Sequence, residues 1–136
     1  MQHWRILLVA GALLLVAASS RTGSLDGTSW TTEVVPDAEA VSKGENMFKD
    51  TLVFADGKFT STACLAYGFK ASPYVADAAG GVSKWKSEQT SEKEGSTTWT
   101  GEAKGIKITG DLAWKKKDGT TLHYVFIGKK TSRPTP

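Results

Sequence analysis

Large aromatic side chains recur at regular intervals in the second half of this chain. Trp85, Trp99 and Trp114 are followed by Tyr124, and Thr97 lies two residues before the second of these tryptophans. Aromatic walls with few polar groups suit an apolar or amphipathic ligand. They also suit a packed core, because each buried ring removes roughly 150–250 Å² from water. The pattern predicts a ligand site of Trp85, Thr97, Trp99, Trp114 and Tyr124, with core filling as the alternative.

Residues that carry catalysis or bind metals are few and scattered. His3 and His123 are the only histidines, and Cys64 is the only cysteine. Sites built from several histidines or cysteines are therefore excluded. Phosphate-binding glycine loops and nucleophile motifs are also missing. We expect no metal, no cofactor and no enzymatic activity, and we interpret Cys64 as a small buried apolar residue rather than a reactive thiol.

The charges are mild and mixed in sign. The chain has 17 basic and 14 acidic residues and a formal charge of +3. Interleaved charges of this size predict no nucleic-acid partner. The run Lys115-Lys116-Lys117 precedes a predicted turn, and we interpret it as a solvated turn. Contact with an anionic surface is the alternative for this run.

Residues 1–20 are predicted to be a secretory signal peptide. Arg5 precedes an uncharged run rich in Leu, Val and Ala over residues 6–18, and small residues follow it. This pattern predicts a secreted or periplasmic protein. The run is shorter than the roughly 20 apolar residues of a membrane span, so none is expected after cleavage; an uncleaved anchor is the alternative. Residues 21–130 are assigned to one domain and 131–136 to a disordered tail.

Turn signals at roughly ten-residue steps divide the domain into short segments. The signals are Asp56-Gly57, Lys93-Glu94-Gly95, Lys104-Gly105 and Asp118-Gly119. Asp-Gly between alternating segments favours a type I′ hairpin turn, which needs a positive φ at both central positions. The predicted strands span 28–35, 48–55, 58–64, 84–92, 96–103, 106–116 and 120–129. We therefore expect an all-β fold, an antiparallel up-and-down meander of 7–8 strands that forms a small barrel.

Alternation within these strands assigns their faces. The residues expected on one shared face are Trp30, Thr32, Val34, Phe48, Leu52, Phe54, Thr97, Trp99, Gly101, Ala103, Ile106, Ile108, Leu112, Trp114, Leu122, Tyr124 and Phe126. One-sided alternation is typical of an antiparallel sheet with one face on a core. The last strand carries Val125 and Ile127 on its other face, which predicts that it is covered on both sides.

Two segments break the alternation. Residues 37–43 begin with an Asp that can cap a helix and precede Gly44, which predicts a helix of one or two turns. Residues 66–83 contain Gly68, Pro73, Gly80 and Gly81 among aromatic residues. We interpret this segment as one long loop over a barrel mouth. A short strand near residues 74–78 is the alternative.

The order of these features resembles the calycin superfamily, which includes lipocalins and avidins. Gly27-Thr28-Ser29-Trp30 opens the first strand, and the resemblance implies that Trp30 plugs the closed end of a barrel. The stretch from Thr97 to Gly101, followed by a strand with Trp114, is similar to avidins. That similarity implies that Trp85, Thr97, Trp99 and Trp114 surround a biotin pocket. The last strand departs from avidins, with Lys129 and Lys130 in place of their Trp and Asp.

The sequence thus predicts an exported, lipocalin-like binding module for a small apolar or amphipathic ligand in the barrel lumen. The alternative is a structural or interaction domain at the cell surface with a filled core and no ligand. Ligand identity and oligomeric state are left open.

Overall fold

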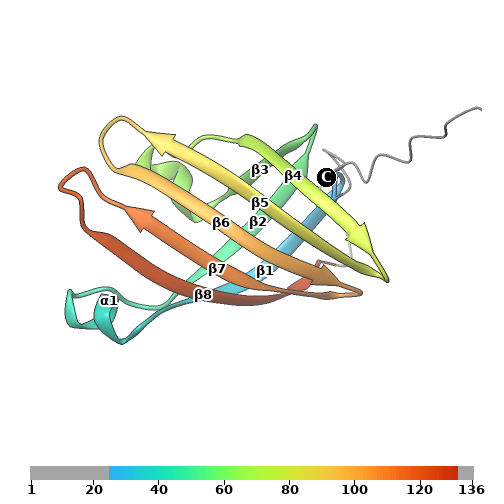
Figure 1. Ribbon diagram of the computed structural model, residues 1–136, viewed down its shortest axis with the longest axis horizontal. Coiled ribbons are helices and arrows are strands. Elements are labelled where there is room, and N and C mark those ends of the chain that lie inside the picture. The colour runs from blue at the N-terminus through green and yellow to red at the C-terminus, as the bar shows by residue number, and fades with distance from the viewer. Residues whose placement is uncertain (1–24, 132–136) are drawn as a thin grey trace, which may run out of the picture.

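The structure, a computed structural model, describes residues 25–131, which form a closed β-barrel (Figure 1). Eight antiparallel strands follow one another around the barrel, and β1 pairs with β8 to close it. The strands are β1 Thr28–Pro36, β2 Phe48–Ala55, β3 Lys58–Ser61, β4 Ser72–Ala79, β5 Val82–Ser91, β6 Gly95–Lys104, β7 Lys107–Lys115 and β8 Thr121–Lys130. The predicted all-β, up-and-down barrel is confirmed. The predicted signal peptide and residues 132–136 of the predicted tail lie outside the described residues.

Two short helical elements join the strands. The helix α1 (Ala38–Ser42) follows β1, and the Asp37 side chain caps it by accepting a hydrogen bond from the Ala40 N–H at 2.8 Å. This confirms the helix predicted over residues 37–43. The 3-10 helix η1 (Ala63–Tyr67) follows β3 and ends at Gly68, which has a φ of 86°. Nothing in the alternation pattern predicted η1, and the strand predicted over residues 58–64 is too long, because β3 ends at Ser61.

The two ends of the barrel are built from different elements. The end named here the closed end carries the β2–β3, β4–β5 and β6–β7 turns and the first described residues. Leu25 is buried there, and its N–H donates to the Tyr74 hydroxyl at 3.0 Å. The opposite end, named the mouth, carries α1, η1 and the β5–β6 and β7–β8 turns (Figure 1). Any open site at the mouth is therefore bordered by helices and turns rather than by strand edges.

The inward faces of the strands follow the predicted alternation. Trp30, Thr32 and Val34 of β1 are buried, and so are Leu122, Tyr124 and Phe126 of β8. The tightest predicted turn is also confirmed, because Asp56 and Gly57 have φ values of 54° and 72°. Positive φ at both positions is what a type I′ hairpin requires.

Glycines in β6 and β7 give the core rings room. Gly101 pairs with Gly110 across the two strands. A Cβ on Gly101 would lie 2.8 Å from Nε1 of Trp85, and one on Gly110 would lie 2.6 Å from the ring of Phe126. A larger residue at either position would therefore push a core ring out of place.

Three further predictions about the fold are wrong. Residues 66–83 are not one loop, because β4 occupies Ser72–Ala79 and Gly80-Gly81 turns directly into β5. The alternative of a strand in this segment is confirmed. The outer face of β8 is not covered, since Val125 and Ile127 are 55% and 49% exposed. Ile106 lies in the β6–β7 turn and is exposed rather than inward.

Candidate functional site

The mouth of the barrel holds a cavity of about 360 Å³. Its walls come from five parts of the chain: the segment between α1 and β2, η1 with the residue after Gly68, and the inner faces of β6, β7 and β8. The lining residues are Gly44, Glu45, Asn46, Met47, Phe48, Ala63, Cys64, Tyr67, Phe69, Thr97, Leu112, Trp114 and Tyr124. Most of these side chains are apolar, and the polar groups among them are few.

A cluster of aromatic rings fills the rest of the barrel. Phe54, Phe59, Tyr74, Trp85, Trp99 and Phe126 are each at most 3% exposed. Neighbouring rings lie with centroids 4.9–5.9 Å apart in tilted or edge-on orientations. Such contacts are favourable beyond the area they bury. The cluster packs the closed half of the lumen.

The structure separates the five predicted site residues into two groups. Thr97, Trp114 and Tyr124 line the mouth cavity. Trp85 and Trp99 lie in the aromatic cluster and are not among the lining residues. Their indole N–H groups are buried and have no hydrogen-bond partner within residues 25–131. These two rings are therefore held by packing alone.

Trp114 is oriented by two neighbours at the rim of the cavity. Its indole N–H donates to the carbonyl oxygen of Glu94 at 2.7 Å. The ammonium of Lys116 lies 5.1 Å from the centre of the ring, within the range of a cation–π contact. The ring is only partly buried. It is thus fixed in place while part of it remains accessible to a ligand.

Tyr124 joins β8 to the segment that leads into β2. Its hydroxyl donates to a carboxylate oxygen of Glu45 at 3.0 Å, and its ring packs edge-on against Phe48 with centroids 6.0 Å apart. Burial, together with the bond to Glu45, raises the pKa of Tyr124 above its ordinary value. The phenol is therefore neutral at physiological pH and offers the cavity a polar edge without charge.

A buried carboxylate holds the start of η1 on the opposite wall. Asp50 of β2 is 4% exposed; it accepts from the Ala63 N–H at 2.9 Å and from the hydroxyl of Ser61. The Ser61 oxygen in turn accepts from the Cys64 N–H at 3.3 Å. Burial raises the pKa of Asp50, although these hydrogen bonds act in the opposite direction. The network fixes the chain where it leaves β3 for the cavity wall.

The segment of residues 62–71, named here the strap, is tied down at its other end by β5. The Ser91 hydroxyl donates to the Tyr67 carbonyl oxygen at 2.7 Å, and the Gln89 amide donates to the Lys70 carbonyl oxygen at 2.9 Å. Phe69 is 2% exposed and packs inward. The strap is therefore an anchored wall of the cavity.

Cys64 faces the cavity from the strap. Its side chain is partly buried, and burial raises the pKa of the thiol to about 11. At neutral pH the group is a thiol and a weak hydrogen-bonding partner rather than a nucleophile. It contributes to the lining mainly as a small apolar surface.

Several lining residues were not predicted from the sequence. Cys64, Phe69 and the segment 44–48 come to the mouth only because the strap and the α1–β2 connection fold over it. One signal was present: Asp50 alternates with Phe48 and Leu52 on the inward face of β2. A carboxylate at an inward position marks a buried polar network.

Other site types find no support in the described part of the chain. Residues 25–131 contain no cluster of three or more His, Cys, Asp or Glu side chains placed to hold a metal ion. No helix among the described residues has the length and apolar character needed to cross a membrane. Comparisons with family models, curated proteins and solved structures gave no match to this chain. Fold and cavity together define its structural class: a small closed antiparallel β-barrel with a cavity at one mouth.

Proposed function

We propose that this protein is an exported, non-enzymatic binding protein that holds a small apolar or amphipathic ligand in the mouth of its barrel. The observation that carries the proposal is the cavity of about 360 Å³ at the mouth of a barrel whose closed half is packed with aromatic rings. Ligand pockets range over roughly 300–1,000 Å³ and are mostly apolar with a few placed polar groups. The accessible ring of Trp114 and the neutral hydroxyl groups of Tyr124 and Thr97 meet this description.

The anchored walls support the same proposal. A wall that is already ordered loses little conformational freedom when a ligand binds, which favours affinity. The strap is bonded at both ends through Asp50 and Ser91, and the α1–β2 segment is bonded through Glu45. We infer that the ligand enters a preformed site. The small cavity restricts it to a compact molecule or to the end of a longer one.

The test is a binding titration with anilinonaphthalene sulfonate, an amphipathic fluorescent probe, on the folded protein. We expect its emission to rise on binding, and we expect medium-chain fatty acids, but not glycerol, to displace it. Biotin belongs in the same panel, because the predicted site resembled a biotin pocket. Native mass spectrometry of protein purified from its host would identify a ligand that is already bound.

A matched pair of variants locates the bound probe. Ala63→Leu adds volume to the cavity wall, whereas Ala113→Leu adds the same volume on the outer face of β7. Because a filled pocket excludes the ligand, we expect Ala63→Leu to weaken probe binding at least tenfold and Ala113→Leu to leave it unchanged. Equal affinity in both variants would place the probe outside the mouth and overturn the proposal.

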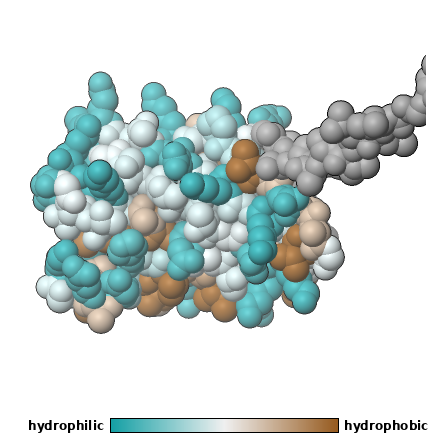
Figure 2. Space-filling model, viewed as in Figure 1, coloured by the Kyte–Doolittle hydropathy of each residue, from teal (hydrophilic) through white to brown (hydrophobic). Residues whose placement is uncertain are grey.

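A second function, an interaction domain at the cell surface, is favoured by the outer face of the barrel. Val125 and Ile127 are about half exposed on β8, and Val35 pairs with Val125 across β1. Figure 2 shows hydrophobic residues gathered along the lower edge of the molecule, near β7 and β8 in Figure 1. Contiguous apolar surface of this kind marks contact sites. This alternative would be supported if the protein bound no probe but associated with another protein through the outer face that contains Val125.

A further inference from the structure

Three lysines stand side by side on the outside of the barrel near its closed end. Lys104 of β6 pairs with Lys107 of β7, and Lys107 pairs with Lys129 of β8. All three side chains are exposed, and none forms an ion pair within the part of the chain that the structure describes. Like charges directly opposite each other on a sheet repel and are destabilising. The three neighbouring lysines therefore do not stabilise the fold, and their arrangement indicates an anionic partner.

Exposed isoleucines interrupt this row. Ile106 lies in the turn between Lys104 and Lys107 and is 69% exposed, and Ile127 is 49% exposed beside Lys129 on β8. Both line a shallow outer groove of about 700 Å³, together with Lys49, Lys107 and Lys129. Glu33 is the single acidic residue in the groove lining. We name Lys104, Lys107, Lys129, Ile106 and Ile127 the lysine face.

The chain enters the barrel at the same end. The first described residue, Leu25, lies at the closed end, and the apolar run of residues 6–18 precedes it in the sequence. Residues 19–24 can span at most roughly 20 Å when extended. If the run is kept as an uncleaved anchor and enters a bilayer, the closed end is held close to the lipid headgroups, where screened electrostatic attraction still acts over about 10 Å.

We propose that the lysine face docks on an anionic phospholipid bilayer. The lysines contact the phosphate headgroups, and Ile106 enters the boundary between the headgroups and the acyl chains. Basic side chains around an exposed apolar residue combine the two attractions that hold peripheral proteins on anionic membranes. The orientation turns the mouth away from the bilayer, so the docking is independent of ligand binding in the mouth cavity.

Vesicle flotation of the full chain tests this proposal. The vesicles are phosphatidylcholine alone and phosphatidylcholine mixed with phosphatidylglycerol. Any insertion of the apolar run over residues 6–18 should not depend on lipid charge, so partitioning onto the neutral vesicles measures its contribution. We expect at least about tenfold stronger partitioning onto the anionic vesicles at low salt, and we expect the excess to disappear in high salt. Equal partitioning onto both kinds of vesicle would overturn the proposal.

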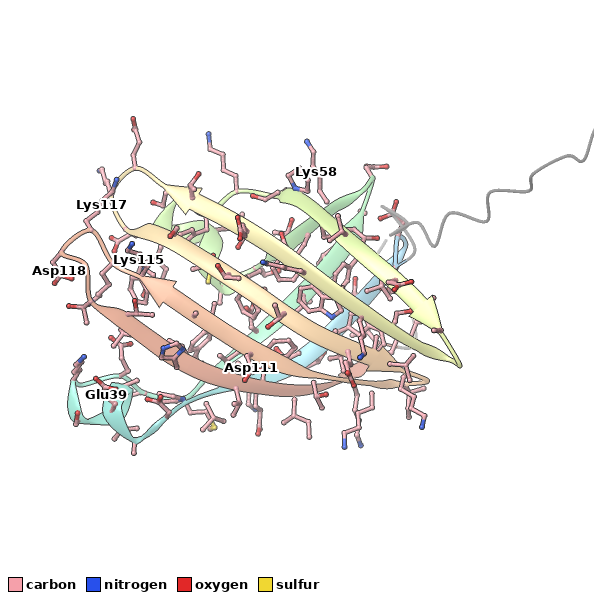
Figure 3. The ribbon with its side chains drawn as sticks, viewed as in Figure 1. Glu39, Lys58, Asp111, Lys115, Lys117 and Asp118 are labelled. Carbon is pink, nitrogen blue, oxygen red and sulfur yellow. The ribbon has the colours of Figure 1, made fainter. Side chains whose placement is uncertain are left out.

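Two charge-matched double variants locate the contact. Lys107→Gln with Lys129→Gln removes two charges from the lysine face. Lys115→Gln with Lys117→Gln removes two charges from the end of β7 and the turn that follows it, at the mouth, the opposite end of the barrel (Figure 3). We expect the first pair to lose most of the anionic excess and the second pair to keep it. All four side chains are exposed, so both proteins should fold alike by circular dichroism.

The variant Ile106→Ser tests the apolar part of the contact. We expect it to lower anionic partitioning several-fold while leaving probe binding at the mouth unchanged. If both double lysine variants lost the anionic excess equally, net charge alone would explain the binding, and the proposal of a defined lysine face would be wrong. A dimer in analytical ultracentrifugation that Ile106→Ser dissociates would assign the face to a second copy of the chain, which also overturns the proposal.

Discussion

Asp50 places a carboxylate on the inner side of a barrel wall, between Phe48 and Leu52 on β2. Burial disfavours its charged form and raises its pKa, and the bonds from Ser61 and Ala63 offset part of that effect. The carboxylate has a structural role, because it accepts a hydrogen bond from the backbone N–H of Ala63 at the start of η1. The residue therefore weakens the fold through its charge while it supports the fold through its hydrogen bonds.

The first prediction concerns Asp50→Asn. A group whose pKa is raised by folding stabilises the folded state most below its unfolded pKa, near 3.8, and loses that contribution as the pH rises through its folded pKa. The amide carries no charge, so we expect Asp50→Asn to gain stability relative to wild type as the pH rises from about 4 to 7. Urea unfolding followed by tryptophan fluorescence measures this difference.

The control is Asp50→Ala, which removes the hydrogen bonds as well as the charge. It leaves the Ala63 N–H and the Ser61 hydroxyl without their acceptor, and we expect a loss of about 1–3 kcal/mol at both pH values. If Asp50→Asn destabilises the protein as much as Asp50→Ala at pH 7, the charge is required and the interpretation of Asp50 is wrong.

The second prediction concerns the thiol of Cys64. Its pKa of about 11 compares with an unperturbed 9.0, so its thiolate fraction near neutral pH is about a hundredfold smaller. We expect alkylation by iodoacetamide to be slow and to accelerate about tenfold per pH unit up to about pH 10, without levelling off. Cys64 is the only cysteine in the chain, so the modified mass reports one site.

The unfolded protein in urea is the reference for this measurement. There the same thiol should approach its limiting rate near its ordinary pKa. A folded protein whose rate levels off in the same range would show that Cys64 is more exposed to water than the cavity wall allows. Because Cys64 lines the cavity, the bound probe should also slow its alkylation.

At the scale of elements, local turn chemistry accounts for most of the fold. Asp56-Gly57 and Asp118-Gly119 both marked hairpins correctly. Asp56-Gly57 is a two-residue turn with positive φ at both positions, whereas the β7–β8 connection is longer and only Gly119 in it has a positive φ. Gly80-Gly81 is also a hairpin signal, yet the Ala-rich strand before it, β4, has only Tyr74 and Val75 of the aromatic and β-branched residues that are usual in strands. β4 was therefore predicted as part of a loop, although Tyr74 and Ala76 alternate inward.

The cavity was predictable only in part, for a related reason. Thr97, Trp114 and Tyr124 belong to regular strands, so alternation placed them inside. The strap residues reach the mouth through bonds between distant positions, such as Asp50 with Ala63 and Ser91 with Tyr67. Alternation also could not tell which inward rings fill the lumen, because Trp85 and Trp99 obey the same period as Trp114.

The third prediction tests how the strap is held. The Ser91 hydroxyl donates to the Tyr67 carbonyl oxygen and accepts from the Glu94 N–H at 3.3 Å, so it joins the strap to the β5–β6 turn. We expect Ser91→Ala to cost about 1–2 kcal/mol and to raise hydrogen exchange in the strap more than in β7 or β8. Thr90→Ala, on the exposed face of β5, is the control and should change neither quantity. Uniform loss of protection would show that the strap unfolds only with the barrel.

At the scale of the whole molecule, the lumen is divided between stability and binding. The closed half is filled by rings such as Phe59 and Trp99, which are fully buried. The half toward the mouth keeps a cavity beside a partly buried Trp114. An eight-stranded barrel is wide enough either to be filled by side chains or to hold one small ligand. This barrel is filled in one half and open in the other, so substitutions in the two halves should have different consequences.

The fourth prediction compares Phe59→Leu with Trp114→Leu. Phe59 contacts three rings of the cluster, so its loss should lower the free energy of unfolding by about 1–2 kcal/mol and leave probe affinity unchanged. Trp114 is partly buried, so Trp114→Leu should lower the free energy of unfolding by only about 1 kcal/mol, mainly through the lost hydrogen bond to Glu94. The same variant should weaken probe binding at least tenfold. Urea unfolding and probe titration of both variants measure the two effects. If Phe59→Leu weakened probe binding as much as Trp114→Leu, the aromatic cluster would be part of the binding site and the lumen would not be divided.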